Sequence, residues 1–201
     1  MTARLIVAGV DEVGRGPLAG PVVAAAVVLP CRLPASLAGV IGDSKAMSAA
    51  AREAVAAALR ACPGVEIGLG AASVAEIAAR NILGATMLAM CRAVRHLPHP
   101  PGVVLVDGNR PPPLDAEVRC IVGGDATEPT IGAASILAKV LRDRLMARLA
   151  LRYPAYRWER NAGYPTAPHR AALEQFGPTP HHRAGFGPVA RLLAAIGPVR
   201  G

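Results

Sequence analysis

The sequence predicts an α/β protein in which helices pack on a mixed β-sheet. Short apolar runs of strand length alternate with longer stretches of helical length, which is typical of a sheet covered by helices. The 201 residues are 52% hydrophobic but only 3% aromatic, so a sizeable core must be built from Val, Ile, Leu and Ala. No internal repeat or low-complexity linker interrupts the sequence. We therefore expect residues 1–201 to form one domain, with residues 152–201 as a C-terminal helical extension.

Five apolar runs have the length and composition of buried strands. Most of them are followed by Gly, Pro or Asp, residues that commonly stand at strand ends. We expect the first two strands to form a hairpin joined by a broad glycine-rich loop. The expected strands are residues 5–10, 22–29, 65–69, 103–106 and 118–122.

Helices are expected between and after these strands. Ser73 with Glu76 matches a capping box, which predicts a long helix that continues to about Leu97 and stops before Pro98. Gly177 marks the end of a shorter helix near the C-terminus. The expected helices are residues 49–61, 73–97, 130–151, 168–176 and 189–196.

The net charge of +8 comes entirely from the last third of the chain. Residues 1–138 carry 11 basic and 11 acidic residues, whereas residues 139–201 carry 11 basic and 3 acidic residues. A basic surface of this kind favours binding to a polyanion, and counterion release would make that binding sensitive to salt. A solvated, arginine-rich face explains the same composition equally well, so charge alone leaves both interpretations open.

The four cysteines show neither the CxxC nor the CxxH spacing of a zinc site, and they indicate no disulfide framework. The N-terminus lacks the pattern of a signal peptide. The most apolar run, residues 17–30, is too short and too interrupted to span a bilayer. We therefore expect a cytoplasmic protein with reduced thiols and no membrane association.

Carboxylates follow three of the five expected strands. Asp11 and Glu12 follow the first strand, and Asp107 and Asp125 follow the fourth and the fifth. Nearby glycines let the backbone turn away, so that a ligand can approach rigidly held side chains. Asp107 or Asp125 alone resembles an ordinary turn residue, but the complete set indicates one site. Adjacent strand residues face opposite ways, so Asp11 and Glu12 share this site only if the strand ends before them.

A cluster of four carboxylates has a characteristic chemistry. The charges repel one another unless a cation neutralises them. Ligation by oxygen alone favours Mg²⁺ or Mn²⁺ over zinc. Two such ions roughly 3.5–4 Å apart can activate a water and stabilise the leaving oxygen of a phosphodiester. No Ser-His pair accompanies the acids, so the sequence favours phosphoryl chemistry over acyl transfer.

The acids lie in segments that resemble the signature motifs of bacterial ribonuclease HII. The first segment is DEVGRGPLAGPVV at residues 11–23, and the resemblance continues in the same order over roughly residues 6–189. The other matching segments are DSK at 43–45, DGN at 107–109, GDAT at 124–127, AASILAKV at 133–140, RD at 142–143, YP at 153–154, GY at 163–164, His169, HR at 182–183 and Phe186. Each motif is weak alone, but the ordered set is highly specific.

The resemblance implies a ribonuclease H-like fold with a five-stranded mixed sheet flanked by helices. It also implies that Asp11, Glu12 and Asp107 are the principal metal ligands and that Asp125 is the fourth catalytic carboxylate. The expected activity is hydrolysis of the RNA strand of RNA/DNA hybrids and cutting at single ribonucleotides in duplex DNA. Cleavage on the 5′ side of the ribonucleotide would leave a 5′-phosphate and a 3′-hydroxyl, with Mn²⁺ or Mg²⁺ as cofactor. We expect a monomer.

Two features resemble parts of the family that distinguish ribose from deoxyribose. The loop Gly14-Arg15-Gly16 would read the 2′-hydroxyl, because glycines bring backbone groups close to a sugar. Tyr164 resembles the family tyrosine that packs on the next deoxyribose, where a 2′-hydroxyl would clash. An ordinary glycine turn and a tyrosine that merely fills the core are the alternatives.

Further substrate contacts are expected from five side chains: Lys45, Ser135, Lys139, Arg142 and Arg183. Lys139 also stands four residues before Asp143, so a plain ion pair on a helix surface is an equal interpretation. His182 and Arg183 could contact substrate or form a solvated basic turn. His169 is expected to be a buried or capping histidine.

The chain departs from the family pattern at three positions where lysine is common. These positions hold Ala46, Gly123 and Ala162. The losses should weaken the grip on phosphate, and Arg157 and Arg160 are candidates to compensate. The carboxylates, and with them the chemistry, are unaffected.

Two other functions fit parts of the sequence. A ribonuclease H-like nuclease with a different substrate, such as a DNA resolvase, would keep the acids but not need the Gly-Arg-Gly loop. A non-catalytic nucleic-acid-binding protein would use the basic C-terminal third. The four acids argue against the latter, because carboxylates repel phosphate unless metal is bound.

Overall fold

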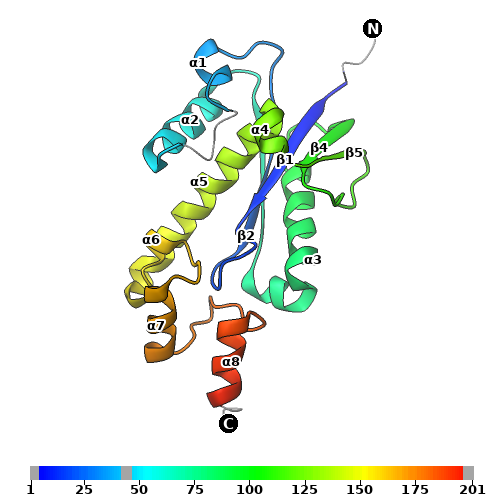
Figure 1. The fold of residues 1–201 in the computed structure, drawn as a ribbon. Helices are drawn as coiled ribbons and strands as arrows, with labels where there is room; N and C mark the ends of the chain where they lie inside the picture. The colour runs from blue at the N-terminus through cyan, green and yellow to red at the C-terminus, as the bar shows by residue number, and fades with distance from the viewer. Residues whose placement is uncertain (1–4, 42–46, 197–201) are drawn as a thin grey trace.

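The computed structural model of the protein describes residues 5–41 and 47–196, which fold into a five-stranded sheet covered by helices (Figure 1). The strand order is β3-β2-β1-β4-β5. β2 is antiparallel to both β1 and β3, whereas β4 is parallel to both β1 and β5, so the expected mixed sheet is confirmed. The strands are β1 (Val7–Val13), β2 (Val22–Val28), β3 (Glu66–Ala72), β4 (Val103–Asp107) and β5 (Glu117–Ile121).

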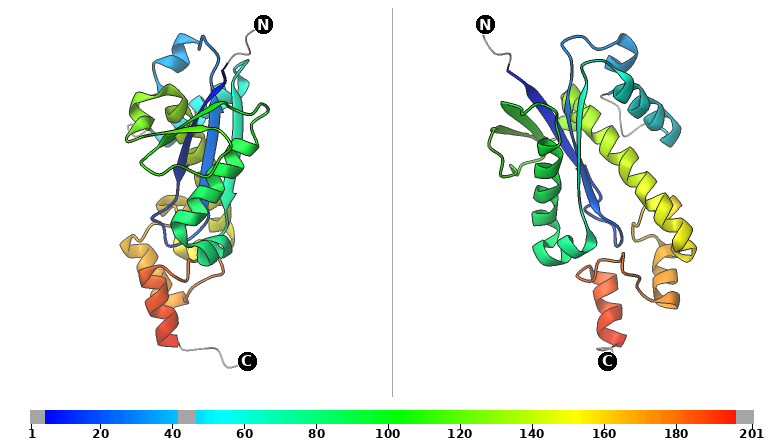
Figure 2. Two further views of the ribbon diagram at one scale, coloured as in Figure 1. Left: turned by 90° about the vertical axis from the view of Figure 1, so that its right-hand side faces the viewer. Right: turned by 180° about the vertical axis from the view of Figure 1, so that it is seen from behind.

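Helices cover both faces of the sheet (Figure 2). α3 (Val74–Arg95) packs on one face, and α5 (Pro129–Arg152) with α2 (Ala49–Ala61) packs on the other. The side chains of β2 alternate between these two cores. This explains why β2 is apolar along its whole length, since a strand buried on both faces has no solvent side.

α3 begins at the capping box expected from the sequence. The Ser73 hydroxyl accepts from the Glu76 amide, and the Glu76 carboxylate accepts from the Ser73 amide. The helix is long and apolar enough to cross a membrane by length and composition. Its apolar residues, including Ala85, Ala89 and Ala93, pack into the sheet core, so α3 is a core helix.

The start of α5 lies directly against β1. A Cβ added at Gly9 would lie 2.2 Å from the backbone carbon of Thr130, so only glycine permits this approach. β1 is the central strand and carries the first two acids, and α5 carries Ser135 and Lys139. The contact therefore fixes the first turns of α5 against the strand that holds the acids.

Most expected elements are found, with α2 at the predicted bounds and the other long helices within a few residues of theirs. The prediction that the first strand ends at residue 10 is wrong, because β1 continues its pairing with β2 as far as Val13. Four short elements were not predicted, since three or four residues are too few to show a periodicity. They are α1 (Ala35–Ala38), α4 (Gly124–Thr127), the 3₁₀ turn Pro154–Tyr156 and α6 (Trp158–Asn161).

The C-terminal residues pack on the far end of α5 and on the loop between β1 and β2. Trp158 packs with Met146 and Ala150 of α5 and with Ala19 of the loop. The last two helices are α7 (Ala167–Phe176) and α8 (Gly187–Ile196), and Leu173 of α7 packs against Leu18 of the same loop. The C-terminal part of the chain therefore supports the glycine-rich loop.

Candidate active site

Three of the four acids of interest lie where β1, β4 and α4 meet. β1 and β4 are parallel neighbours, and Val10 of β1 pairs with Val106 of β4. The next residues along the two strands are Asp11 and Asp107, which places these carboxylates on adjacent strands at the same level of the sheet. The Gly124 amide at the start of α4 donates to Asp107 Oδ1 at 2.8 Å and brings Asp125, the next residue, beside β4.

Asp11 is buried among other acids. It is 7% exposed, and burial raises the pKa of its carboxyl from 3.8 to about 7. A hydrogen bond from the Ser135 hydroxyl of α5 opposes this rise, and the negative charges of Glu12 and Asp107 add to it. A buried carboxylate whose pKa is raised in this way gains stability when a cation approaches.

Only one of the two carboxylate oxygens of Glu12 has a hydrogen-bond partner. Its Oε1 accepts from the exposed Arg15 guanidinium at 3.3 Å, whereas its Oε2 is buried with no hydrogen-bond partner. Burial raises the pKa of Glu12, Arg15 lowers it and the charge of Asp107 raises it. Burying a carboxylate oxygen without a hydrogen-bond partner costs free energy. Binding of a cation to Glu12 Oε2 would offset that cost.

Asp11 and Glu12 extend from opposite faces of β1, because the strand does not end before them. Asp11 pairs with Ala25 of β2 and Glu12 with Ala24, so the expectation that the strand stops at residue 10 is corrected. Successive strand residues alternate in direction. Asp11 contacts Ser135, Glu12 contacts Arg15, and both carboxyls are influenced by the charge of Asp107.

The carboxylate oxygens of the acids suit a hard divalent cation, but these side chains do not surround a common point in this structure. Within residues 5–41 and 47–196, no three acidic, histidine or cysteine side chains are grouped so as to hold a metal ion as they stand. Asp107 accepts from the Gly124 amide, and Glu12 accepts from Arg15. The free Glu12 Oε2 and the raised pKa of Asp11 are the features that a cation would relieve, and all the donors are oxygen.

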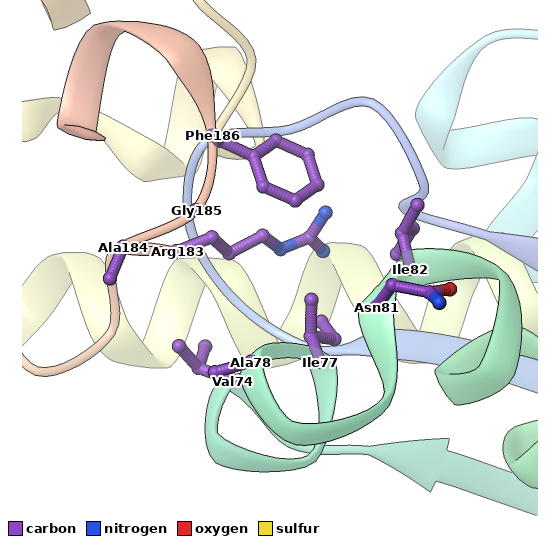
Figure 3. A pocket seen from close by; sticks show the side chains of 9 residues that line it. All are labelled: Val74, Ile77, Ala78, Asn81, Ile82, Arg183, Ala184, Gly185 and Phe186. Carbon is purple, nitrogen blue, oxygen red and sulfur yellow. The ribbon is translucent and has the colours of Figure 1, made fainter. Parts of the chain in front are cut away.

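The glycine-rich loop, residues 14–21, is tied down by a buried arginine from the C-terminal part of the chain. Arg183 donates from Nε to Gly20 O at 2.9 Å and from its two terminal nitrogens to Arg15 O at 2.9 Å and Gly14 O at 2.6 Å. Its guanidinium lies 5.0 Å from the centre of the Phe186 ring, beside a cavity of about 350 Å³ next to α3 (Figure 3). The side chain is buried and each guanidinium nitrogen already donates to a backbone carbonyl, which argues against the predicted contact between Arg183 and substrate.

Arg142 of α5 has the same role on the other side of this loop. Its three guanidinium nitrogens donate to Pro21 O, Ala162 O and Ala19 O at 2.9 to 3.1 Å, and the side chain is completely buried. This burial argues against the predicted contact between Arg142 and phosphate. Gly14, with φ +95°, makes room for it, since a Cβ there would lie 2.1 Å from Arg142 Nε.

Tyr164 lies beside the loop and remains accessible. Its side chain belongs to a residue that is 42% exposed, which disfavours a role in filling the core. A Cβ at Gly16 would lie 3.6 Å from Cε1 of the tyrosine ring, so ring and loop are neighbours. The two features expected to read the sugars are therefore adjacent.

The other predicted contacts have mixed outcomes. Lys139 donates to Asp143 at 2.7 Å, which is the ion pair expected as one of its two interpretations. His169 is buried, as expected, whereas the interpretation of His182 as part of a solvated turn is wrong, because it is buried too. Lys45 and Ala46 lie outside the described residues.

The supporting role of the two arginines is a feature that sequence reasoning missed. One signal was available for Arg142: it stands on α5 four residues from both Ala138 and Met146, and all three are fully buried. A buried helical stripe that contains an arginine indicates a side chain with internal partners. No comparable periodicity surrounds Arg183, so its partners could not be inferred.

Comparisons with known proteins agree with the geometry. The family model described as Ribonuclease HII matches residues 8–189. A ribonuclease HII of Granulibacter bethesdensis is 67% identical over 190 residues, which cover 94% of this chain and 87% of the relative. A ribonuclease HII of Rhodospirillum rubrum is 60% identical over 189 residues, with the same two coverages.

Solved structures show the same fold. The ribonuclease H2 of Pyrococcus horikoshii has a TM-score of 0.79 and 26% identity, covering 94% of this chain and 97% of that one. Bst-RNase HIII, solved in complex with Mn²⁺, has a TM-score of 0.73 at 20% identity, covering 95% of this chain and 70% of that one. The expected ribonuclease H-like fold is thereby confirmed. Since the family match and the close relatives extend over nearly the whole chain, it belongs to the ribonuclease HII family of metal-dependent endoribonucleases.

Proposed function

We propose that this chain cuts the RNA strand of RNA/DNA hybrids and cuts duplex DNA on the 5′ side of an embedded ribonucleotide. Hydrolysis leaves a 5′-phosphate and a 3′-hydroxyl. Family membership supports the substrate class. The observation that carries the proposal is the buried acidic cluster, in which Glu12 Oε2 has no partner and the pKa of Asp11 is raised to about 7.

In this proposal four carboxylates, Asp11, Glu12, Asp107 and Asp125, hold divalent cations. Mg²⁺ and Mn²⁺ both suit an all-oxygen donor set. Bound ions would lower the pKa of a water and stabilise the leaving oxygen of the phosphodiester. Asp125 is 5% exposed and follows the Gly124 amide that holds Asp107, so movement of one carboxylate is coupled to the backbone of the other.

The protein contributes position as well as charge. Ser135 holds Asp11 from α5, and Arg15 occupies Glu12 Oε1. If Glu12 held a cation, its pairing with Arg15 would weaken, and the exposed Arg15 guanidinium would be available to the phosphate backbone. Arg15 is thus a pairing partner in the absence of substrate and a substrate contact in its presence.

Substrate selection is assigned to the loop Gly14-Arg15-Gly16 and to Tyr164. The loop reads the 2′-hydroxyl at the cleaved position through backbone groups, and the tyrosine ring packs on the next deoxyribose. The closeness of Gly16 to the ring supports this division, because an RNA-to-DNA junction places the two sugars side by side. In this proposal Lys45 and Lys139 contact phosphate groups. The enzyme is a monomer in the cytoplasm, and its basic C-terminal residues lie along the duplex.

The test uses end-labelled duplexes that contain zero, one or four ribonucleotides, each incubated with Mg²⁺, with Mn²⁺ or with chelator. We expect metal-dependent cutting of the second and third duplexes and none of the first. Cutting of an all-DNA branched duplex would instead support a resolvase. Binding that is indifferent to chelator, without any cleavage, would contradict the catalytic assignment.

A further inference from the structure

A buried cluster of aromatic and imidazole rings lies behind Tyr164 and has no role in the proposed chemistry. Trp158 of α6, His169 of α7 and His182 are all buried. The two imidazole rings lie 5.3 Å apart, and Tyr156 packs against His182 at 4.9 Å. Burying two histidines next to each other is unusual unless their hydrogen bonds are satisfied.

The hydrogen bonds of His169 fix its tautomer. Its Nδ1 lies 2.8 Å from the carbonyl oxygen of Tyr164, which can only accept, so Nδ1 carries the hydrogen and donates. The indole Nε1 of Trp158 donates to His169 Nε2 at 3.1 Å. His169 is therefore neutral, with a bare Nε2 that receives hydrogen bonds.

His182 has the opposite tautomer. The Thr179 amide donates to its Nδ1 at 2.9 Å, so that nitrogen is bare and Nε2 carries the hydrogen. His182 Nε2 lies 3.1 Å from His169 Nε2 and donates to the same lone pair that accepts from Trp158, so the two donors share one acceptor. Burial lowers the pKa of His182 to about 4, with the neighbouring His169 and His181 adding to the effect, which agrees with two neutral rings.

The chain of hydrogen bonds ends at the backbone of Tyr164. It runs from the Thr179 amide through His182 and His169 to the Tyr164 carbonyl. That carbonyl also accepts from the Thr166 amide at 2.8 Å, and the Tyr164 amide donates to Asn161 O at 2.8 Å. The exposed phenol ring therefore projects from a backbone that is held on both sides, beside Gly16.

We propose that His169 and His182 are positioning residues that set where the Tyr164 ring stands against the Gly14–Gly16 loop, and thereby set the preference for an RNA-to-DNA junction over continuous RNA. The inference rests on the proposed role of Tyr164. Neither histidine touches substrate or the carboxylates. They act on selectivity through the tyrosine, and the hydrolytic chemistry is independent of them.

The test compares selectivity, defined as kcat/KM for a duplex with one ribonucleotide divided by kcat/KM for a duplex with a long RNA tract. His182→Phe keeps a ring of similar size but removes the hydrogen bonds to His169 and from Thr179. We expect selectivity to fall by about fivefold to tenfold, which corresponds to the net free energy of about one hydrogen bond. His182→Gln can donate to His169 and accept from Thr179, so it should retain selectivity to within about twofold. His169→Phe should resemble His182→Phe.

A control and a double variant separate positioning from general damage. Tyr156→Phe loses the hydrogen bond from its hydroxyl to Gly177 O in the same cluster but touches neither tautomer, so its selectivity should equal that of the parent. Tyr164→Ala combined with His182→Phe should be no less selective than Tyr164→Ala alone, because the histidine acts only through the ring. Unchanged selectivity in both phenylalanine variants, or a multiplied loss in the double variant, would overturn the proposal.

Nuclear magnetic resonance of the ¹⁵N-labelled full chain tests the same claim without substrate. The parent should show the Nδ1–H tautomer for His169 and the Nε2–H tautomer for His182. The Tyr164 signals should shift in His182→Phe and stay in place in Tyr156→Phe. If Tyr164→Ala leaves selectivity unchanged, the proposed role of the tyrosine fails. The Tyr164 shifts in His182→Phe still decide separately whether the histidines position the tyrosine. Unshifted Tyr164 signals in that variant would refute the positioning.

Discussion

Two groups of buried charge lie beside α5, and they differ in how well their hydrogen bonds are satisfied. The acids at the start of the helix leave Glu12 Oε2 without a partner and raise the pKa of Asp11 to about 7. The buried arginines, Arg142 of α5 and Arg183 from the C-terminal part of the chain, donate from every guanidinium nitrogen to backbone carbonyls. The comparison teaches that burial alone does not mark a ligand site. A buried charged group that lacks a hydrogen-bond partner is suited to bind a ligand. A buried charged group whose nitrogens all donate to backbone carbonyls stabilises the fold instead.

The largest effect that tests this contrast is on catalysis. Asp11→Asn should lower metal-dependent cleavage of a duplex with one ribonucleotide by at least about a thousandfold, since a metal ion supplies several kcal/mol of transition-state stabilisation. The measurement is single-turnover cleavage with saturating Mg²⁺ or Mn²⁺. Normal turnover in the variant would refute the assignment of Asp11.

An arginine variant should instead affect folding. Arg183→Ala leaves three backbone carbonyls without their donor, two of them in buried hydrogen bonds, and should lower the free energy of unfolding by about 3 kcal/mol. Arg160→Ala, which removes an exposed arginine side chain from the same C-terminal part of the chain, is the matched control and should change stability by less than about 0.5 kcal/mol. Urea unfolding of the two variants makes the comparison; equal destabilisation would show that Arg183 is not a structural tie.

The pH dependence of stability distinguishes the two groups further. The pKa of Asp11 is about 7 in the folded state against 3.8 in the reference state, so the folded protein keeps the proton longer and loses stability as the pH rises through this window. In chelator, the melting temperature of Asp11→Asn should therefore exceed that of the parent by an amount that grows from pH 4 to pH 7 and then levels. A difference that shrinks over this range would contradict the raised pKa.

The smallest effect concerns Lys139. Its partly exposed pair with Asp143 should contribute about 0.3–0.5 kcal/mol, so Lys139→Ala and Asp143→Ala should be equally and weakly destabilised. A phosphate contact would show in binding: Lys139→Ala should weaken duplex binding and reduce its salt dependence, whereas Asp143→Ala should not. If the two variants bind the duplex equally well, the phosphate contact is refuted and Lys139 has only its role in the ion pair.

Local patterns predicted the elements well. The capping box at Ser73 marks the start of α3, and Ser48 and Pro63-Gly64 stand on either side of α2, so the bounds followed from neighbouring residues. The end of β1 did not follow, because the pairing of Glu12 with Ala24 in β2 extends the strand past two charged residues that look like a strand end. Tertiary pairing decides such cases.

The acids were predicted from strand ends and family motifs, but the roles of the buried arginines and histidines were not. Arg183 meets Gly14 and Gly20, which lie more than 160 residues away in the sequence. Its partners are carbonyl oxygens, which every residue possesses, so no side-chain pattern records the contact. The tautomers of His169 and His182 depend in the same way on backbone atoms of Tyr164 and Thr179.

The close approach of α5 to Gly9 has a consequence for how this enzyme can vary. One continuous helix meets β1 at its first turn, carries Ser135 to the acids and then delivers Arg142 to the loop. Inserting a single residue between Ser135 and Arg142 would rotate one relative to the other by about 100°. The helical repeat of α5 therefore fixes the position of the acids relative to the glycine-rich loop, and a change of helix length between Ser135 and Arg142 would disrupt both contacts.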